Sequence, residues 1–350
     1  MKKSGAFLFS RCLLRKLIAA AFAAFIAALA VFMLWPAPDR GLVLYSGLDY
    51  GPDVASAFTA ETGIQIRVVR LATGSLLARM AAQGHHPDWD MAWFDGATAA
   101  AALDDARLLQ RHLPAPAHLT AIGQGLLSAD GAYIPTGFTL AGVFISNPAR
   151  LADPPSGWRG LMAPALRGQV GMNDPSISGP TYPMLAGMLA QAGGWPRGRG
   201  FVAALKANDL QMFDKNDATL AALQAQVINL AIVQSSAALY FAASHPQLRV
   251  TLPNPVFMLP NVMVEAAGLP ARRQAEVAQF MSFAMRPDIQ KLRQAQGEAD
   301  GDYWPVTSDT QPLPALPDLG LLHIATLDPI YWGRQERRIN NWFAAMMAGG

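Results

Sequence analysis

The segment LVLYSGLDYGPDVASAFTAETGIQIRVV, residues 42–69, decides the fold class. Its first four residues, 42–45, are a short apolar run, which predicts a buried strand. Apolar residues then recur at helical spacing over 52–62, and Gly63 is placed to end that helix. Residues 64–69 alternate and are rich in β-branched side chains, as expected for a second strand. The order strand, helix, strand predicts a parallel sheet covered by helices.

The same alternation continues along the chain and then starts again as a second unit. Two further helices and a strand extend the first unit, and a Pro- and Gly-rich stretch separates it from the second. The remaining strands are predicted at 90–94, 142–146, 169–172, 210–213, 228–233, 248–252 and 256–264, and the helices at 75–81, 97–103, 182–192, 200–207, 217–226, 237–243, 270–285 and 287–296.

Composition favours a globular protein with two domains. The chain has 350 residues, of which 52% are hydrophobic and 15% charged, so it can bury a large core. The formal charge of +2 comes from the N-terminus, because positions 41–350 hold 21 basic and 24 acidic residues, a charge of −3. No long run of Lys and Arg occurs there, so nucleic-acid binding is not expected.

The N-terminus predicts export from the cytoplasm. A basic stretch ends at Lys16, and an apolar run without charges follows over residues 17–35. This arrangement is typical of an export signal, but the run is also near the length of a membrane span. A cleaved signal and an uncleaved membrane anchor therefore both remain open. The single cysteine, Cys12, precedes the run, and a cysteine-free exported body is compatible with the bacterial periplasm.

Small polar residues and glycines follow most of the predicted strands. In open α/β sheets ligands bind beyond the carboxyl ends of the strands, where the next helix N-terminus favours an anionic group. The alternative is that these residues only cap helices and form turns. The candidate ligand-binding residues are Ser46, Gly47, Gly74, Ser75, Asp95, Ser176, Ser178, Gly179, Thr181, Gln234, Ser235 and Ser236.

Two features of this set separate the alternatives further. The segment 176–181 is the strongest candidate, because Gly179 lets a ligand approach the backbone and Pro180 favours the start of a helix. Asp95 could contact a ligand amine or hydroxyl, or be a solvated turn residue. Tyr45 and Trp93 could stack on a ligand or belong to the core.

Catalytic patterns are absent from the sequence. None of the six histidines has metal-site spacing, and no G-x-S-x-G, H-E-x-x-H or P-loop pattern occurs. We therefore expect a binding protein and not an enzyme, with no catalytic residue, no metal site and no cofactor.

Several short segments occur in the order seen in one protein family. They include LYSG at 44–47, FTAETGI at 58–64, GSLLARM at 74–80, and the segments 147–151, 166–170, 173–179, 287–290 and 303–306. Together they resemble the family 1 bacterial extracellular solute-binding proteins, and most closely their ferric-ion and phosphonate type.

The resemblance implies the type II periplasmic-binding-protein fold, an α/β fold with two lobes joined by a two-strand hinge, whose crossovers would be the extended segments near 138–146 and 248–257. Residues 1–40 would be the signal peptide or anchor, residues 41–140 with 257–350 lobe 1, and residues 141–256 lobe 2. The solute would bind between the lobes. The protein would work in the periplasm with the permease and ATPase subunits of an ABC importer.

The resemblance also bears on the solute. Iron-binding members carry two adjacent tyrosines after the strand that here ends at Val233, whereas this chain has Gln234-Ser235-Ser236. The segment 178–181 is similar to the oxyanion-binding turn of phosphate- and phosphonate-binding members, although Pro180 offers no N–H. A small anionic organic solute, phosphonate- or sugar-phosphate-like, is therefore expected. A ferric-iron-binding protein and a membrane-anchored solute sensor are the alternatives.

Overall fold

The computed structural model describes residues 40–349. The predicted signal or anchor at 17–35, and Cys12, lie outside the described residues. From Leu42 onward the chain forms one structural unit. Within residues 40–349 no helix has both the length and the apolar character needed to cross a membrane.

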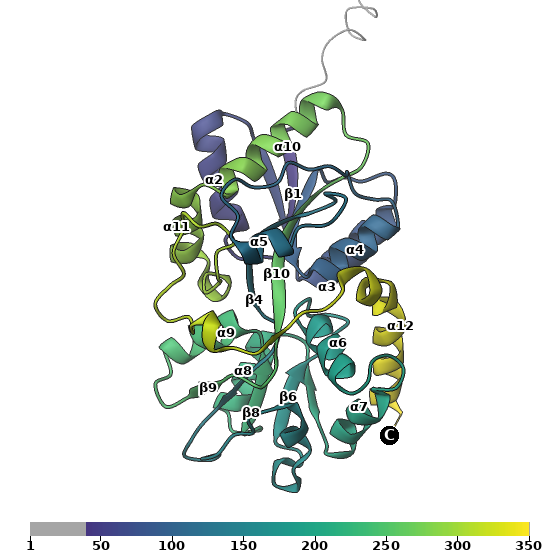
Figure 1. Ribbon diagram of the computed structural model, residues 1–350, viewed down its shortest axis with the longest axis vertical. Helices are drawn as coiled ribbons and strands as arrows, with labels where there is room; N and C mark the ends of the chain where they lie inside the picture. Colours follow the sequence, from purple (N-terminus) through teal and green to yellow (C-terminus); the bar gives the residue numbers. More distant parts are fainter. Residues whose placement is uncertain (1–39, 350) are drawn as a thin grey trace, which may run out of the picture. The chain divides into compact units, whose positions relative to one another are not determined.

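The first of two sheets draws its strands from both ends of the described chain (Figure 1). Its strands are β1 (Leu42–Ser46), β2 (Ile66–Arg70), β3 (Met91–Asp95), β4 (Ile134–Leu140), β10 (Val256–Glu265) and β11 (Ile324–Ala325). Their order is β11-β10-β3-β1-β2, with β4 also paired to β10. β1, β2 and β3 are parallel, but β10 runs antiparallel to β3 and β4. The predicted parallel sheet is therefore mixed, because β10 returns from the second sheet in the opposite direction.

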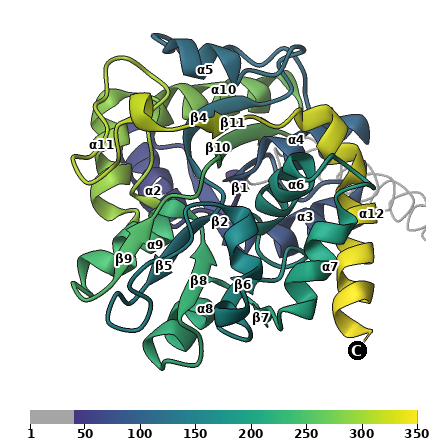
Figure 2. The same ribbon diagram turned by 60° about the horizontal axis from the view of Figure 1, so that its bottom comes forward.

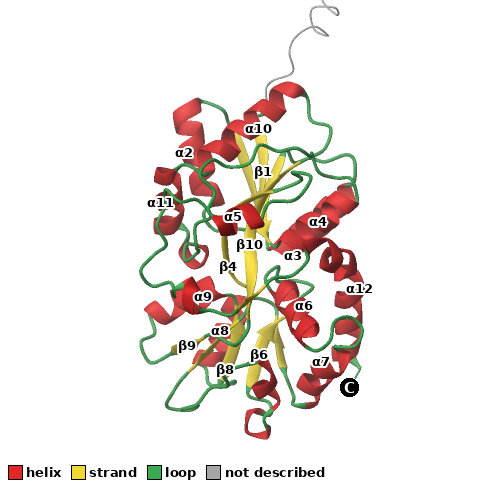
Figure 3. Ribbon diagram, viewed as in Figure 1, coloured by secondary structure: helices red, strands yellow, loops and turns green. Residues whose placement is uncertain are grey.

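Helices cover both faces of this sheet (Figure 3). One face carries α2 (Gly51–Thr62), α10 (Ala271–Ala284) and α11 (Pro287–Gln296), and the other carries α3 (Thr73–Gln83) and α4 (Ala97–Asp105). The alternation along β1 explains this division, since Leu42 and Leu44 pack in one core while Val43 and Tyr45 pack in the other. Tyr45 and Trp93 are fully buried in these cores, so they pack the fold and do not stack on a ligand.

The second sheet is built from the middle of the chain. Its strands are β5 (Val143–Ser146), β6 (Val170–Asn173), β7 (Gln211–Phe213), β8 (Leu230–Val233) and β9 (Arg249–Thr251), in the order β7-β6-β8-β5-β9. β6 is parallel to β7 and β8, and β5 is antiparallel to β8 and β9. Helices α6 (Thr181–Gln191) and α7 (Arg199–Ala207) pack on one face, and α8 (Asn216–Gln224) and α9 (Ser235–Ala243) on the other.

The chain passes between the sheets at two short connections. The first, residues 141–142, joins β4 to β5, and the second, residues 252–255, joins β9 to β10. Both lie inside the crossovers that were predicted near 138–146 and 248–257. Two α/β lobes joined in this way confirm the predicted fold class. We keep the predicted lobe boundaries as a proposal.

The C-terminal helix α12 (Pro329–Ala348) contacts helices of both sheets (Figure 2). Near its start, Arg334 forms an ion pair with Asp105 of α4 at 2.8 Å. Near its end, the Lys206 ammonium of α7 donates to the carbonyl oxygen of Met346. The C-terminal segment is thus a helix whose apolar residues Trp332, Ile339 and Phe343 complete the core of the second sheet.

Two local predictions differ from the structure. The helix expected to start with Ser75 as its cap begins at Thr73, so Ser75 is its third residue and is exposed. The segment expected only as an extended crossover before 142 contains β4, a buried strand of seven residues. Its pairing with β10 joins positions about 120 residues apart in sequence, which local pattern does not encode.

Candidate functional site

A cavity of about 630 Å³ lies where the carboxyl ends of strands from both sheets meet. The first sheet contributes Gly47 after β1, Arg70 at the end of β2 and Asp95 at the end of β3. The second contributes Asp214 after β7 and Gln234 after β8. This is the position at which α/β sheets bind ligands, and the volume suits a small organic solute.

Five of the twelve predicted ligand-binding residues line this cavity. They are Gly47, Asp95, Ser178, Gly179 and Gln234. Ser178 is 8% exposed, and its Oγ accepts a hydrogen bond from Asn173 Nδ2 at 3.1 Å, which leaves the hydroxyl proton available to a ligand. The rule of strand ends therefore selects these five positions correctly as cavity residues.

Most of the other predicted hydroxyl residues are engaged within the protein. Ser46 Oγ donates to the Leu48 carbonyl, and Ser236 Oγ accepts from Gln234 Nε2. Ser235 Oγ accepts from the backbone N–H of Leu140, where β4 leads into the first connection. These serines hold the loops and the hinge in place, and they do not line the cavity.

The remaining three predicted hydroxyl residues, Ser75, Ser176 and Thr181, also lie outside the cavity lining. Ser75 and Ser176 are exposed, and the Ser176 hydroxyl is bonded to the Asp174 carboxylate at 2.6 Å. Thr181 is buried as the first residue of α6. The direction of a hydroxyl group is set by tertiary packing, so sequence alone could not separate these residues from the five that line the cavity.

The start of α3 touches the loop before α6, and this contact closes one side of the cavity. A Cβ placed on Gly74 would lie 2.5 Å from the Ile177 carbonyl oxygen, and one on Gly179 would lie 2.4 Å from Thr73 Cβ. These distances are too short for any side chain. Gly74, predicted as a ligand-binding residue, therefore permits the two backbones to meet.

Four helices begin at the cavity without a side-chain cap. They are α3, α6, α8 and α9, and the cavity lining includes Thr73, Pro180, Asn216 and Ala237 from their first turns or cap positions. The first N–H groups of a helix have no partner inside it, and together they carry a partial positive charge. Such positions favour an oxyanion.

Sequence reasoning missed Asp300, which joins the two sides of the cavity. It lies in the short helix η3 (Glu298–Asp300), after α11. Its carboxylate accepts a hydrogen bond from the backbone N–H of Asp49 at 2.8 Å and another from Gln234 Nε2 at 3.0 Å. No strand precedes Asp300, so the strand-end rule could not find it.

Burial raises the pKa of two carboxyl groups of the cavity, those of Asp95 and Asp300. Burial, reinforced by the negative charge of Asp300, holds the pKa of Asp95 well above its usual range. Burial also raises the pKa of Asp300 to about 7, although the hydrogen bond from Gln234 and the charge of Arg70 oppose this. In both groups burial outweighs the hydrogen bonds and charges that favour the ionised form.

Acidic side chains outnumber basic ones around the cavity. The basic residues are Arg70, which is ion-paired with Asp49, and Lys215, which lies 3.1 Å from Asp217. The acidic residues are Asp49, Asp95, Asp214, Asp217, Glu298 and Asp300. An anion alone would thus meet helix N-termini that favour it and carboxylates that do not.

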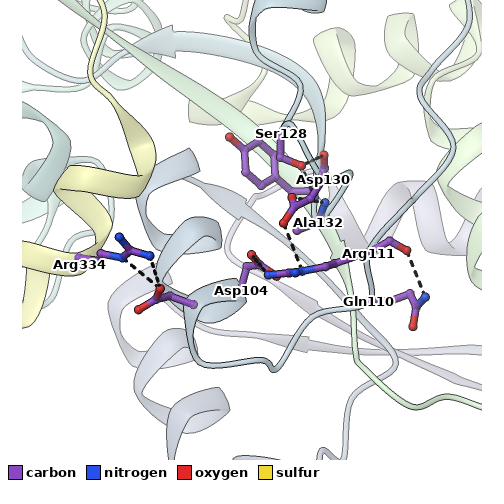
Figure 4. A network of polar contacts seen from close by, with 9 residues as sticks. Asp104, Gln110, Arg111, Ser128, Asp130, Ala132 and Arg334 are labelled. Carbon is purple, nitrogen blue, oxygen red and sulfur yellow. Dashed lines mark hydrogen bonds and ion pairs between the residues drawn. The ribbon is translucent and has the colours of Figure 1, made fainter.

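A second cavity, of about 740 Å³, lies beside α4 and the start of α12. There Arg111 lies 2.8 Å from Asp104 and 3.2 Å from Asp130, and Arg334 pairs with Asp105 (Figure 4). These opposite charges compensate one another inside the protein. These paired groups therefore need no charged ligand to neutralise them. The cavity between the sheets is the better candidate for the solute site.

Among residues 40–349 no three His, Cys, Asp or Glu side chains are grouped so that they could hold a metal ion. The tyrosine pair of iron-binding relatives is replaced by Gln234-Ser235, and the one tyrosine of the lining, Tyr240, is half exposed at the rim.

Solved structures of similar fold are periplasmic binding proteins. The periplasmic binding protein AfuA from Actinobacillus pleuropneumoniae, with fructose-6-phosphate bound, matches with a TM-score of 0.77 and 17% identity, covering 89% of this chain and 99% of that one. Iron-bound HitA from Pseudomonas aeruginosa matches with a TM-score of 0.72 and 19% identity, covering 86% and 98%. A periplasmic thiamin binding protein matches with 0.70 and 16%, covering 88% and 96%. At these identities the likeness establishes the fold alone.

No functionally curated protein matches the sequence significantly. The profile of the family described as bacterial extracellular solute-binding protein matches residues 53–321, which is more than three quarters of the chain and includes every strand of both sheets except β1 and β11. This match agrees with the resemblance found in the short sequence segments. The chain belongs to the bacterial extracellular solute-binding protein family.

Proposed function

We propose that this protein is the solute-binding subunit of an ABC importer and captures a small organic solute that carries an oxyanion, such as a phosphonate or a sugar phosphate. The solute binds in the periplasm, in the cavity between the two sheets, and is passed to the permease and ATPase subunits. The convergence of four uncapped helix N-termini on that cavity carries the proposal.

Two further observations support an organic oxyanion over ferric iron. Fe³⁺ requires several hard anionic donors around one ion, whereas residues 40–349 hold no group of three or more His, Cys, Asp or Glu side chains that could bind a metal ion. AfuA, which has the same fold, was solved with a sugar phosphate bound. The hydroxyl of Ser178, which lines the same cavity, would add a hydrogen bond to those of the helix N-termini.

A ligand panel tests the proposal. The purified full-length chain is heated with phosphonates, sugar phosphates, amino acids, polyamines or Fe³⁺, and the unfolding temperature is recorded. A ligand that binds only the folded protein stabilises it by about 2.7 kcal/mol at a concentration 100 times Kd. We expect stabilisation by at least one phosphonate or phosphate ester. Stabilisation by Fe³⁺ alone, or by polyamines alone, would contradict the oxyanion claim.

A further inference from the structure

We propose that Asp95, Asp300 and Gln234 form a subsite for a protonated primary amine, so that the solute is a zwitterion with an amine as well as an oxyanion. This inference rests on the proposed function, because it describes a second group on the same solute. It assigns a role to the carboxylates that an anion alone leaves unexplained.

Asp95 is built as a hydrogen-bond acceptor that faces the cavity. It is the last residue of β3 and is 4% exposed. Among the described residues its carboxylate accepts one side-chain hydrogen bond, from Asn261 Nδ2 to Oδ1, and Oδ2 accepts none. The Asp95 carboxylate, which lines the cavity, can therefore accept a further hydrogen bond from a ligand N–H group.

Gln234 supplies an independent sign that a hydrogen-bond donor is missing. Its side chain is 3% exposed, and its Nε2 donates both to Ser236 Oγ and to the Asp300 carboxylate. This orientation leaves Oε1 buried without a donor from the described residues. The reversed amide would place its oxygen, and not a donor, against the Asp300 carboxylate, which favours the orientation described.

Together these groups match the donors of an ammonium ion. Asp95 Oδ2, Gln234 Oε1 and the remaining lone pairs of Asp300 offer three acceptors, and an alkylammonium has three N–H donors. Its positive charge would also offset the repulsion between the two carboxylates. Arg70 does not take this role for Asp95, because its guanidinium is ion-paired with Asp49.

Amine binding at this subsite depends on pH. The groups that face Asp300 are Asp95, Glu298, Arg70 and the Gln234 amide, and the pKa that results is about 7. Below that pH the Asp300 carboxyl is protonated and attracts an ammonium weakly. The affinity for an amine-bearing ester, relative to that for the same ester without the amine, should therefore rise as pH increases through about 7.

Three esters that differ at one end test the subsite. Calorimetric titration of the full-length chain at pH 8 compares 2-aminoethyl phosphate, 2-hydroxyethyl phosphate and ethyl phosphate. We expect the amine ester to bind about tenfold or more tightly than the hydroxyl ester, as a charge-assisted hydrogen bond provides. Asp95→Asn should remove this preference without weakening the binding of ethyl phosphate, because it removes a carboxylate and not a donor to the oxyanion. Asp217→Asn, which alters an exposed carboxylate at the same cavity, should keep it.

The outcomes separate the subsite from the proposed function. Equal affinity for the amine and hydroxyl esters, or an unchanged preference in Asp95→Asn, would overturn the amine subsite alone. Binding of ethanolamine without binding of any phosphate ester would support the subsite and contradict the oxyanion. Stabilisation by Mg²⁺ or Ca²⁺ alone that Asp95→Asn abolishes would assign the carboxylates to a metal and overturn the proposal. Asp300→Asn provides the same comparison if Asp95→Asn does not fold.

Discussion

Gly74, the second residue of α3, lies so close to Ile177 that a Cβ on the glycine would stand 2.5 Å from the isoleucine carbonyl oxygen. Gly74 follows β2 of the first sheet, and Ile177 lies in the loop after β6 of the second sheet. Their contact closes the cavity on one side, as expected if the lobes close around a solute by bending at the two connections.

Gly74→Ala should therefore weaken solute binding without harming the fold. Gly74 is helical, with no left-handed backbone, so alanine suits its conformation, but its methyl group obstructs the contact with Ile177. Overpacking of this kind costs about 1–3 kcal/mol, or roughly five- to 150-fold in affinity. Calorimetric titration measures the loss.

Gly200→Ala is the matched control for that substitution. Gly200 is the second residue of α7, as Gly74 is of α3, and an added Cβ there meets open space. The affinity of Gly200→Ala for the solute should equal that of the unmodified chain. Equal affinities for both variants would show that the α3 contact does not contribute to closure.

Ser178→Ala should lower the affinity for the oxyanion-bearing solute and leave the fold intact. The lost hydroxyl costs one hydrogen bond to a charged group, about 1.5–3 kcal/mol, whereas Asn173 Nδ2 keeps its bond to Asn216 Oδ1 at 2.7 Å. Ser176→Ala, two residues away and exposed, should have no effect on affinity. Unchanged affinity in Ser178→Ala would show that Ser178 does not bind the solute.

Ser235→Ala should lower stability and not affinity, although Ser235 was predicted as a ligand-binding residue. Its Oγ accepts from the buried Leu140 N–H at 2.9 Å, and alanine leaves that donor without a partner. A buried unsatisfied donor costs about 1–3 kcal/mol, which urea denaturation measures. A loss of affinity at unchanged stability would instead show that Ser235 binds the solute.

Glu265→Gln should stabilise the protein above neutral pH. Burial, reinforced by the charge of Asp90, raises the pKa of Glu265 to about 7, and the side chain is 2% exposed. The folded protein then binds a proton that the unfolded chain, with a pKa near 4.3, releases, so stability falls as pH rises between these values. Glutamine removes this loss, roughly 2–4 kcal/mol at pH 8.

Denaturation curves at pH 4 and pH 8 check this expectation. The two proteins should be nearly equal at pH 4, where Glu265 is protonated in both states. Glu61→Gln, at an exposed ion pair with Arg286, should show no such dependence on pH. A variant that is less stable than the unmodified chain at pH 8 would contradict the buried, unpaired environment of Glu265.

The fold was largely predictable because its pattern is local. Buried strands such as β1 and β8 are uninterrupted apolar runs, and glycine or small polar residues follow them. The antiparallel course of β10 was not predictable, since it depends on pairing with β3 and β4, which lie far away in the sequence.

The candidate site was predictable only where it follows strands. Asp95 and Gln234 come directly from that rule, and both line the cavity. Asp300 comes from a loop after α11 and meets Gln234 only because the last part of the chain returns to the cavity. The functions of Ser46 and Ser235 depend on where their hydroxyl groups point, which is a property of packing and not of local sequence.

The most direct test of the central claim is the titration of the full-length chain with phosphate and phosphonate solutes at pH 8, repeated with Gly74→Ala and Ser178→Ala. Our account predicts saturable binding of at least one such solute, weakened in both variants and unchanged in Gly200→Ala and Ser176→Ala. Binding that is equally strong in all five proteins would contradict it, because the solute would then lie outside the cavity between the two sheets.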